Sequence, residues 1–393
     1  MKKLLVATAI AALMSTAVNA ETIKLGVILG YTGPIESLTP DMAAGAELAI
    51  KEVSESGALL GGAKVVSVRG DTTCTDSAAA TAATERLVTA DKINAIVGGD
   101  CSGVTTAMLQ NVALANGIVM ISPSATSPAL SSIKDNGLFF RTAPSDARQG
   151  QVLTAILKDK GIKSAALTYT NNDYGKGLAN SIKTNFEKSG GKITISAAHE
   201  DGKADYTAEV GALAAAGGDV LIVAGYLDQG GKGIIQAALD TGAFDRFVLP
   251  DGMIGDSLPM AIGKDLNGSF GTVPGTDSPG AAKFGEMAKA AGFKAGPFAS
   301  ESYDAAALIM LAMQASGSSK SKMLKDKVLD VANAPGTKIY PGELAKGLKI
   351  LAKGGQVDYV GASAVELIGP GESAGNYREI LVSGGKNTTA RFR

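Results

Sequence analysis

The chain has 393 residues, a formal net charge of −1, two cysteines, one histidine and no tryptophan. This near-neutral balance, with no basic block, argues against a nucleic acid partner. A chain of this length exceeds what one hydrophobic core usually supports, so we expect two domains. Fifty glycines and an aromatic content of 5% are typical of a chain with many tight turns.

The N-terminal segment has the features of a secretory signal peptide. Lys2 and Lys3 form a short positive region, residues 4–13 are apolar, and the small-residue sequence VNA ends at Ala20. We expect these twenty residues to be removed, leaving 373 residues from Glu21 onward with a charge of −3 once the two lysines are lost. An uncleaved anchor is the alternative, but the apolar run is shorter than the roughly 20 residues that span a bilayer. The sequence therefore predicts an exported, soluble protein.

From Glu21 onward, strand and helix patterns alternate, which is typical of a parallel sheet covered by helices. In such sheets ligands bind outside the carboxyl ends of the strands. The predicted elements of the first unit are strands at 21–30, 64–68, 93–97, 118–121 and 137–140, and helices at 41–56, 76–90 and 102–116.

Hydroxyl groups follow two successive strands of this unit. Ser102 opens the helix after the third strand, and Ser124 and Thr126 follow the fourth. Free backbone N–H groups and the positive end of a helix dipole at such a place attract a small anion. We expect a carboxylate site here. The alternatives are that Ser102 only caps its helix and that the other two residues only shape the turn before Pro128.

The two cysteines also follow predicted strands, Cys74 after VVSVRGDTT and Cys101 after the strand at 93–97. In an oxidising compartment two cysteines are expected to pair. Two free thiols or a metal pair are the alternatives. Because His199 is the single histidine, a zinc site lacks ligands, and neither a metal nor a cofactor is predicted. His199 lies between a strand end and the charged loop EDGK, so we expect it on the surface.

The strand and helix rhythm begins again near residue 145. Strands are predicted at 164–169, 192–197, 219–223 and 247–249, with helices at 177–188, 205–216 and 228–239. Tyr174, Tyr226 and Asp251 follow strand ends and are candidates for the other side of a cleft; packing aromatics and a turn cap are the alternatives. For Asp146 and Arg148 a hinge or helix-start role is favoured over ligand contact. The last third is predicted to be mostly helical, followed by a strand at 375–383 and a polar tail.

Taken in order, several segments resemble the type I periplasmic binding proteins of the branched-chain amino acid (Leu/Ile/Val) ABC transporters. They include IKLGVILGYTGP, DTTCTDS, GGDCS, VMISPSATSPAL, FFRTAPSDARQG, YTNNDYGKGLA and VLIVAGY. The resemblance implies two Rossmann-like, doubly wound lobes with three crossovers and a ligand cleft between them. Residues 21–142 and 272–363 would form lobe 1, and residues 143–271 and 364–393 lobe 2. It also implies a Cys74–Cys101 disulfide.

The resemblance further implies the residues that hold the ligand. Ser102, Ser124 and Thr126 of lobe 1 would bind the α-carboxylate and part of the ammonium group, and charge-assisted hydrogen bonds of this kind are strong. Asp251 of lobe 2, with Tyr174 and Tyr226, would face them. Two residues depart from the family pattern: an acidic position that is often glutamate is Asp251, and a pocket position that is aromatic in leucine-binding members is Leu38.

These inferences predict the substrate-binding component of an ABC importer. It would bind leucine, isoleucine or valine and deliver it to membrane permease subunits driven by cytoplasmic ATPase subunits, and we expect a monomer. The same fold could instead bind a polar or aromatic amino acid, an aromatic acid or an amide such as urea, or serve as a sensor. An exported enzyme is disfavoured because no G-x-G-x-x-G motif follows the first strand and the single histidine, His199, is not placed at a strand end with a nucleophile.

Overall fold

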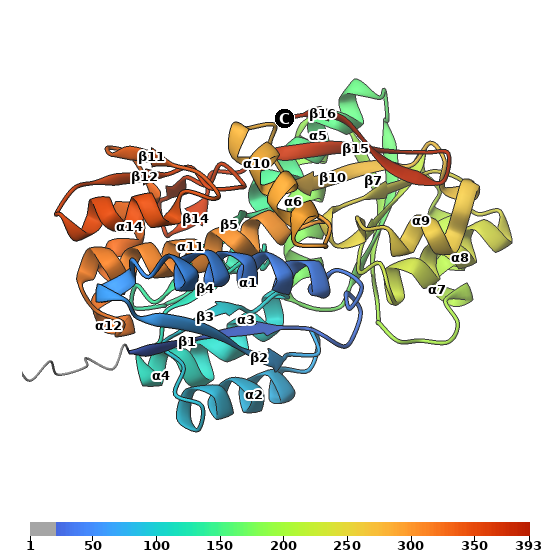
Figure 1. Cartoon of the computed structure of the whole chain (residues 1–393). Coiled ribbons are helices and arrows are strands. Elements are labelled where there is room, and N and C mark those ends of the chain that lie inside the picture. Colours follow the sequence, from blue (N-terminus) through green and yellow to red (C-terminus); the bar gives the residue numbers. More distant parts are fainter. Residues whose placement is uncertain (1–20) are drawn as a thin grey trace, which may run out of the picture.

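The computed structural model describes residues 21–393, which form two α/β lobes side by side (Figure 1). The predicted signal peptide, residues 1–20, lies outside the described residues. Each lobe has a seven-stranded sheet, and the chain crosses between the two sheets three times, after β5, after β10 and before β15. The predicted architecture of two doubly wound lobes is confirmed.

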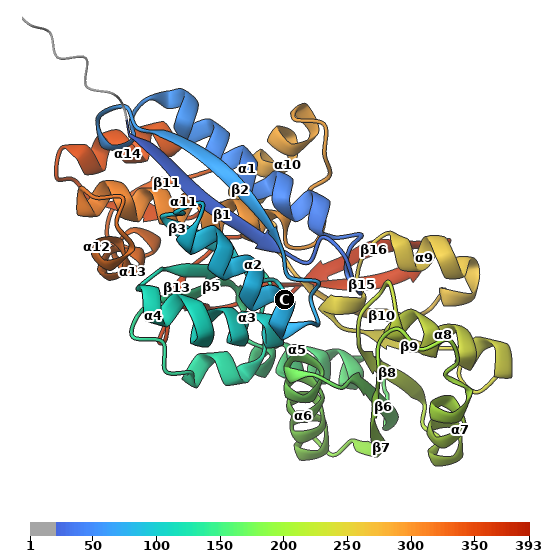
Figure 2. The same ribbon diagram turned by 90° about the horizontal axis from the view of Figure 1, so that it is seen from below.

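The first sheet has the order β13-β14-β5-β4-β3-β1-β2, and β1 to β5 are parallel. Seen from below, β1 and β2 run towards the second lobe, so their carboxyl ends face it (Figure 2). The strands of this sheet are β1 (Thr22–Leu29), β2 (Lys64–Asp71), β3 (Ala95–Gly98), β4 (Met120–Ser122), β5 (Phe139–Pro144), β13 (Leu367–Ile368) and β14 (Glu372–Ser373).

The second sheet has the order β16-β15-β10-β9-β8-β6-β7. Its strands from β6 to β10 are parallel, and β15 and β16 are antiparallel additions at one edge. These strands are β6 (Ser164–Thr170), β7 (Lys192–His199), β8 (Val220–Ala224), β9 (Phe247–Leu249), β10 (Phe270–Pro274), β15 (Tyr377–Ser383) and β16 (Lys386–Phe392).

Helices cover both faces of each sheet. The first lobe holds α1 (Thr39–Ser56), α2 (Ser77–Thr89), α3 (Ser102–Met108), α4 (Leu114–Asn116), α10 (Pro279–Ala290), α11 (Ala299–Ser316), α12 (Ser321–Leu324), α13 (Val328–Ala332) and α14 (Leu344–Ala352), with a small sheet of β11 (Thr337–Ile339) and β12 (Val357–Tyr359). The second lobe holds α5 (Asp146–Asp159), α6 (Asp173–Lys188), α7 (Thr207–Ala216), α8 (Gly230–Thr241) and α9 (Ser257–Ile262). None of these helices is both long and apolar enough to cross a membrane.

The C-terminal third differs from the prediction in three places. β13 and β14 join the first sheet beside β5, although we assigned all residues from 364 onward to the second lobe. The polar tail forms β16, because an edge strand pairs through its backbone and can expose both faces of its side chains to water. In the part predicted to be mostly helical, a 3₁₀ turn at residues 325–327 separates α12 from α13.

The most deeply buried helix is α11, which lies beside α1 on one face of the first sheet (Figure 1). A glycine permits the close approach of the two helices. A Cβ atom added at Gly45 of α1 would lie 2.3 Å from the carbonyl oxygen of Ala299, which is closer than any real contact allows. Large residues at position 45 would therefore push α1 away from the core.

A disulfide joins Cys74, after β2, to Cys101, before α3, with 5.2 Å between the Cα atoms. The predicted pairing is confirmed, and the alternatives of free thiols or a metal pair are wrong. It fixes the loop that leads into the helix starting at Ser102. We expect replacement of both cysteines by alanine to lower the free energy of unfolding by about 3–4 kcal/mol, measured by urea denaturation. An unchanged free energy of unfolding would contradict this stabilising role.

The two lobes touch through side chains and backbone at the mouth of the cleft. The backbone N–H of Ser37, in the loop after β1, donates to Asp228 Oδ2 over 3.0 Å, and the Asp228 N–H donates to the Pro34 carbonyl over 3.1 Å. Ser257 at the start of α9 donates to the other oxygen of Asp228 over 2.6 Å. We call these contacts of Asp228 the interlobe latch. They hold the lobes closed on each other.

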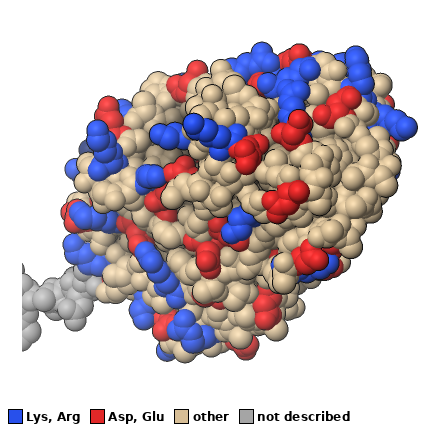
Figure 3. Space-filling model, turned by 90° about the vertical axis from the view of Figure 1, so that its right-hand side faces the viewer, with Lys and Arg blue, Asp and Glu red and all other residues tan. Residues whose placement is uncertain are grey.

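Acidic and basic side chains are interspersed over the face of the second lobe that Figure 3 shows, with tan surface between them. No continuous basic surface is visible on that face.

Candidate ligand-binding site

A small cavity of about 20 Å³ lies between the lobes, where the carboxyl ends of the two sheets meet. Since about 10–15 Å³ of such space holds one water molecule, an amino acid can enter only when the lobes separate. A wider hollow of about 490 Å³ beside α8 is lined by the second lobe alone. The interlobe cavity is lined by Ile35, Leu38, Asp100, Cys101, Ser102, Ser124, Tyr174, Tyr226, Asp251, Gly252 and Phe298.

Six of the seven predicted ligand residues line this cavity. The exception is Thr126, which is buried with 1% exposure but stands behind the lining. These residues lie up to 213 positions apart in the chain, from Leu38 to Asp251, and the fold brings them to one place.

The first lobe contributes two hydroxyl groups to the cavity, and each forms a hydrogen bond with the backbone of that lobe. Ser102 Oγ accepts a hydrogen bond from the Ser127 N–H over 3.1 Å, and Ser124 Oγ donates to the Asp100 carbonyl over 3.0 Å. The Ser102 hydroxyl keeps its proton free to donate, and the Ser124 hydroxyl keeps its lone pairs. The helix-cap alternative for Ser102 is wrong, because Cys101 occupies the N-cap position.

Asp100 joins the ends of the strands beside these two hydroxyl groups. Its carboxylate accepts hydrogen bonds from the Gly30 N–H over 2.6 Å and from Thr72 Oγ1 over 2.9 Å, joining the ends of β1, β2 and β3. Burial raises the pKa of Asp100, and these two donors lower it. Its lone pairs are thus largely engaged within the first lobe.

Arg141 anchors the loop that carries Ser124 and Thr126, and the sequence analysis did not single it out. Its guanidinium donates to the carbonyls of Ala125 and Ser127 over 3.0 and 2.9 Å, and pairs with Glu372 of β14 over 2.5 Å. Arg141 has 1% exposure. The signal in the sequence was an arginine inside the apolar strand FFRTAP, since a charge there needs several partners.

The second lobe contributes Asp251 and the two tyrosines. Asp251 begins the 3₁₀ turn after β9 and accepts a hydrogen bond of 2.7 Å from the Tyr174 hydroxyl. The same hydroxyl accepts one of 3.1 Å from the Gly252 N–H. The Tyr174 and Tyr226 rings stack with centroids 5.2 Å apart. Only glycine fits at position 252, because a Cβ there would lie 2.6 Å from the Gly225 carbonyl oxygen.

Asp251 and Asp146 are both buried, with 2% and 0% exposure, and each affects the charge of the other. Burial and then the nearby charge of Asp251 raise the pKa of Asp146 well above its usual value. Burial raises the pKa of Asp251, and the Tyr174 hydrogen bond lowers it. The Thr126 hydroxyl lies near enough to Asp146 to favour its charged form, but makes no hydrogen bond of good geometry.

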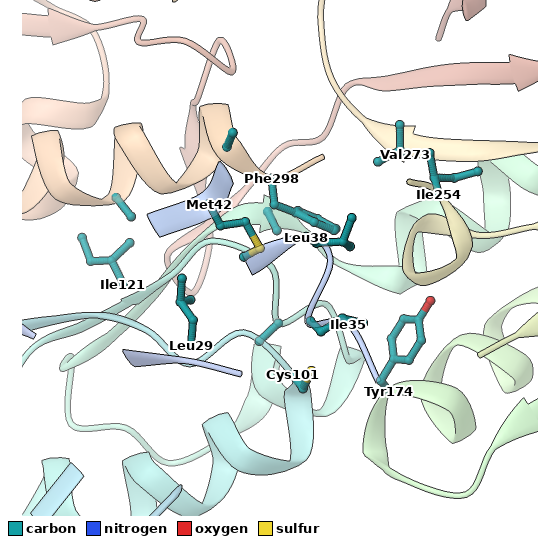
Figure 4. Close-up of a cluster of buried hydrophobic side chains, with 14 of the residues drawn as sticks. Leu29, Ile35, Leu38, Met42, Cys101, Ile121, Tyr174, Ile254, Val273 and Phe298 are labelled. Atoms are coloured by element: carbon teal, nitrogen blue, oxygen red, sulfur yellow. The ribbon is translucent and has the colours of Figure 1, made fainter. Parts of the chain in front are cut away.

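The apolar part of the cavity comes from Ile35, Leu38 and Phe298, which Figure 4 shows grouped near Tyr174. Phe298 precedes α11 and has φ of +61°, an unusual backbone angle for a large residue. It supplies an aromatic ring near Leu38 from a distant segment of the chain. No sequence prediction assigned Phe298 to the site.

Three other predictions concern residues outside the cavity. Asp146 is the first residue of α5, after the Ser145 cap, as the helix-start interpretation expected, and Arg148 is exposed.

The prediction that His199 lies on the surface is wrong: the residue has 1% exposure and its Nδ1 lies 2.8 Å from Thr168 Oγ1. Burial lowers the pKa of His199 to about 4. Among residues 21–393, no three His, Cys, Asp or Glu side chains group as a metal site would need.

Comparisons with known proteins agree with this geometry. The sequence model of a family described as "Periplasmic binding protein" matches residues 22–356. A leucine-, isoleucine-, valine-, threonine- and alanine-binding protein of Pseudomonas aeruginosa is 29% identical over 275 residues, 70% of this chain and 72% of the relative.

Solved structures share the fold. The leucine-binding protein LivK of Thermotoga maritima has a TM-score of 0.80 at 21% identity, covering 94% of this chain and 98% of that one. A solute-binding protein of an ABC transporter from R. palustris, in complex with benzoate, has a TM-score of 0.76 at 20% identity, covering 94% and 96%. At these identities the likeness establishes the fold and leaves the ligand open. On the match over residues 22–356, the chain belongs to the periplasmic binding protein family.

Proposed function

We propose that this protein binds leucine, isoleucine or valine between its lobes and delivers it to the membrane permease of an ABC importer. The observation that carries the proposal is the composition of the interlobe cavity. Hydroxyls of Ser102 and Ser124 stand on one side, the carboxylate of Asp251 stands on the other, and apolar side chains lie between them. A zwitterion with an aliphatic side chain needs these three kinds of neighbour.

No chemistry is required of the protein. The ligand would touch both lobes only in the closed form, so it stabilises that form by its differential affinity. The proposal places the protein in the periplasm after removal of residues 1–20, and takes the permease and, through it, the ATPase subunits as partners. The name of the Pseudomonas relative supports an aliphatic amino acid and extends the candidates to threonine and alanine.

Aromatic acids form the second candidate class, because Phe298 and the stacked tyrosines surround the cavity and a structure of this fold binds benzoate. Asp251 discriminates between the two. An ionised carboxylate attracts an ammonium group and repels an organic acid that carries only negative charge.

A thermal-shift screen of amino acids, aromatic acids and small amides tests the proposal. The protein is first unfolded and refolded to remove bound ligand. A ligand at 100 times its Kd adds about 2.7 kcal/mol of stability, which should raise the melting temperature of a chain of this size by roughly 3 °C. Leucine, isoleucine or valine should give such a shift, and their D-enantiomers serve as controls. If none of the aliphatic amino acids shifts the melting temperature, the proposed ligand class is wrong.

A further inference from the structure

A group of buried polar side chains beneath the cavity lacks hydrogen-bond partners among the described residues. Its members come from the first lobe, from α5 and from β15, close to the crossovers. The unpartnered atoms are Thr126 Oγ1, both carboxylate oxygens of Asp146, Gln149 Oε1 and the Tyr377 hydroxyl. Buried polar atoms nearly always have a hydrogen-bond partner. The oxygens of this cluster therefore need hydrogen-bond donors beyond those of the neighbouring side chains.

Hydrogen bonds join two of these residues to their neighbours, and electrostatic effects connect the group to Asp251. The Asp146 N–H donates to the Thr126 carbonyl over 2.8 Å. Gln149, on the same face of α5 as Asp146, donates to Thr272 Oγ1 over 3.1 Å, and its side chain also favours the charged form of Asp251. The charges of Asp146 and Asp251 both raise the pKa of Tyr377. The cluster therefore links the crossover region directly to the acid that faces the ligand.

The cluster holds two carboxyl groups but no free cation. Arg141 is the nearest guanidinium, and its donors already serve two carbonyls, Ser131 and Glu372. Two neighbouring carboxylates in a buried site cannot both stay ionised, so one of them keeps a proton. A protonated carboxyl also supplies the donor that the acceptors of Asp146 and Gln149 lack.

The other titratable and charged groups around the pair do not replace this proton. Arg148 of α5 is exposed, and the hydroxyls of Tyr174 and Tyr377 carry protons because burial raises the pKa of both well above its usual value. Asp100, across the cavity, is bound to Gly30 and Thr72.

We propose that Asp146 and Asp251 hold one proton between them in the unliganded protein, and that the ammonium group of an amino acid displaces it. Binding then exchanges one positive charge for another: the ammonium enters beside Asp251 and one proton leaves to water. This inference rests on the proposed function and adds a proton linkage to it. Asp146 acts through Asp251 and is a positioning residue.

The linkage has a definite sign. Since the unliganded pair holds a proton that the complex lacks, affinity rises with pH, by up to about tenfold per pH unit for one released proton. Ordinary aspartates have a pKa near 3.9 and are already ionised at pH 5, so they add little dependence above that pH. Burial also raises the pKa of Glu301 to about 7 and that of Asp304 to about 6, and comparison with Asp146→Asn separates these two acids of α11 from the pair. The rise ends when the pH exceeds the pKa at which the unliganded pair gives up its proton.

The test is titration calorimetry of leucine with the intact protein in two buffers of different ionisation enthalpy, at about pH 6. We expect release of close to one proton per leucine in the wild type and close to none in Asp146→Asn, whose affinity should change less than twofold between pH 6 and pH 8, against tenfold or more in the wild type. Asp173→Asn is the matched control: it removes an exposed acid at the same first position of α6, and should keep the proton release.

Leucine binding without proton release would overturn this inference and leave the proposed function intact. A second measurement is independent of the ligand. Infrared difference spectra between the unliganded wild type and each variant near pH 6 should show a protonated carboxyl band that Asp146→Asn or Asp251→Asn loses and Asp173→Asn keeps. A band from Glu301, whose pKa burial raises to about 7, cancels in these differences. Absence of that band would overturn the shared proton even if leucine is not the ligand, whereas failure of every amino acid to bind, with the band present, would overturn the proposed function instead.

Discussion

Replacing Asp251 with asparagine is expected to weaken leucine binding by roughly 100-fold or more, because loss of one partner of a buried charge pair costs about 2–5 kcal/mol. The fold should survive, since the variant keeps the shape of the side chain, places no charge in this buried site, and can still accept the Tyr174 hydrogen bond through its amide oxygen. We expect an unchanged or higher melting temperature in the unliganded variant. Calorimetry with leucine and thermal melting followed by circular dichroism measure the two effects.

Two comparisons sharpen this experiment. Asp173→Asn, which removes an exposed acid, should leave the affinity unchanged. Tyr174→Phe removes the hydroxyl that bonds Asp251 and Gly252, and should lie between Asp251→Asn and the wild type. An Asp251→Asn variant that binds leucine as tightly as the wild type would show that the ammonium group does not depend on this residue.

Replacing Arg141 with methionine is expected to lower the free energy of unfolding by about 3 kcal/mol. This value is at the low end of the range for a broken buried ion pair, because the Glu372 side chain is 16% exposed. The carbonyls of Ala125 and Ser127 also lose their donors. Since this loop carries Ser124 and Thr126, leucine affinity should fall as well. Urea denaturation measures the stability, and calorimetry measures the affinity.

The exposed neighbour Arg148 offers a matched control, and Arg148→Met should change the free energy of unfolding by less than about 0.5 kcal/mol. The double variant Arg141→Met with Glu372→Gln separates two causes. If the unpaired Glu372 charge dominates, the double variant regains most of the lost stability; if the two carbonyls dominate, it does not. Stability equal to that of the wild type in Arg141→Met would contradict the anchoring role.

The sequence pattern was sufficient for features that depend on short stretches of chain. The alternation of apolar strands with helices predicted both parallel sheets, and polar residues directly after strands located the cavity, because the carboxyl ends of parallel strands meet at one edge. The Cys74–Cys101 pair followed from the compartment implied by the N-terminal segment, with the family resemblance in support. Tyr174 and Asp251 were recognised as strand-end residues, although their mutual hydrogen bond was not.

Features that depend on the packing of distant segments were missed. The positions of Phe298 beside Leu38, and of Tyr377 near Asp146, depend on how the crossovers place the last third of the chain. His199 was placed on the surface because a charged loop follows it, yet it ends a strand that the rest of the lobe covers. β16 has no apolar periodicity, and only its backbone pairing with β15 makes it a strand.

The interlobe latch bears on how a transporter distinguishes loaded from empty protein. The Ser37 N–H donates to the Asp228 carboxylate and the Asp228 N–H donates to the Pro34 carbonyl, and neither hydrogen bond involves a ligand atom. They therefore favour closure in the empty protein too. A stronger latch would reduce the free energy that the ligand must provide for closure and so raise its apparent affinity. The same change would raise the share of empty, closed molecules that compete for the permease. The strength of this contact therefore sets a compromise between sensitivity to scarce ligand and unproductive docking.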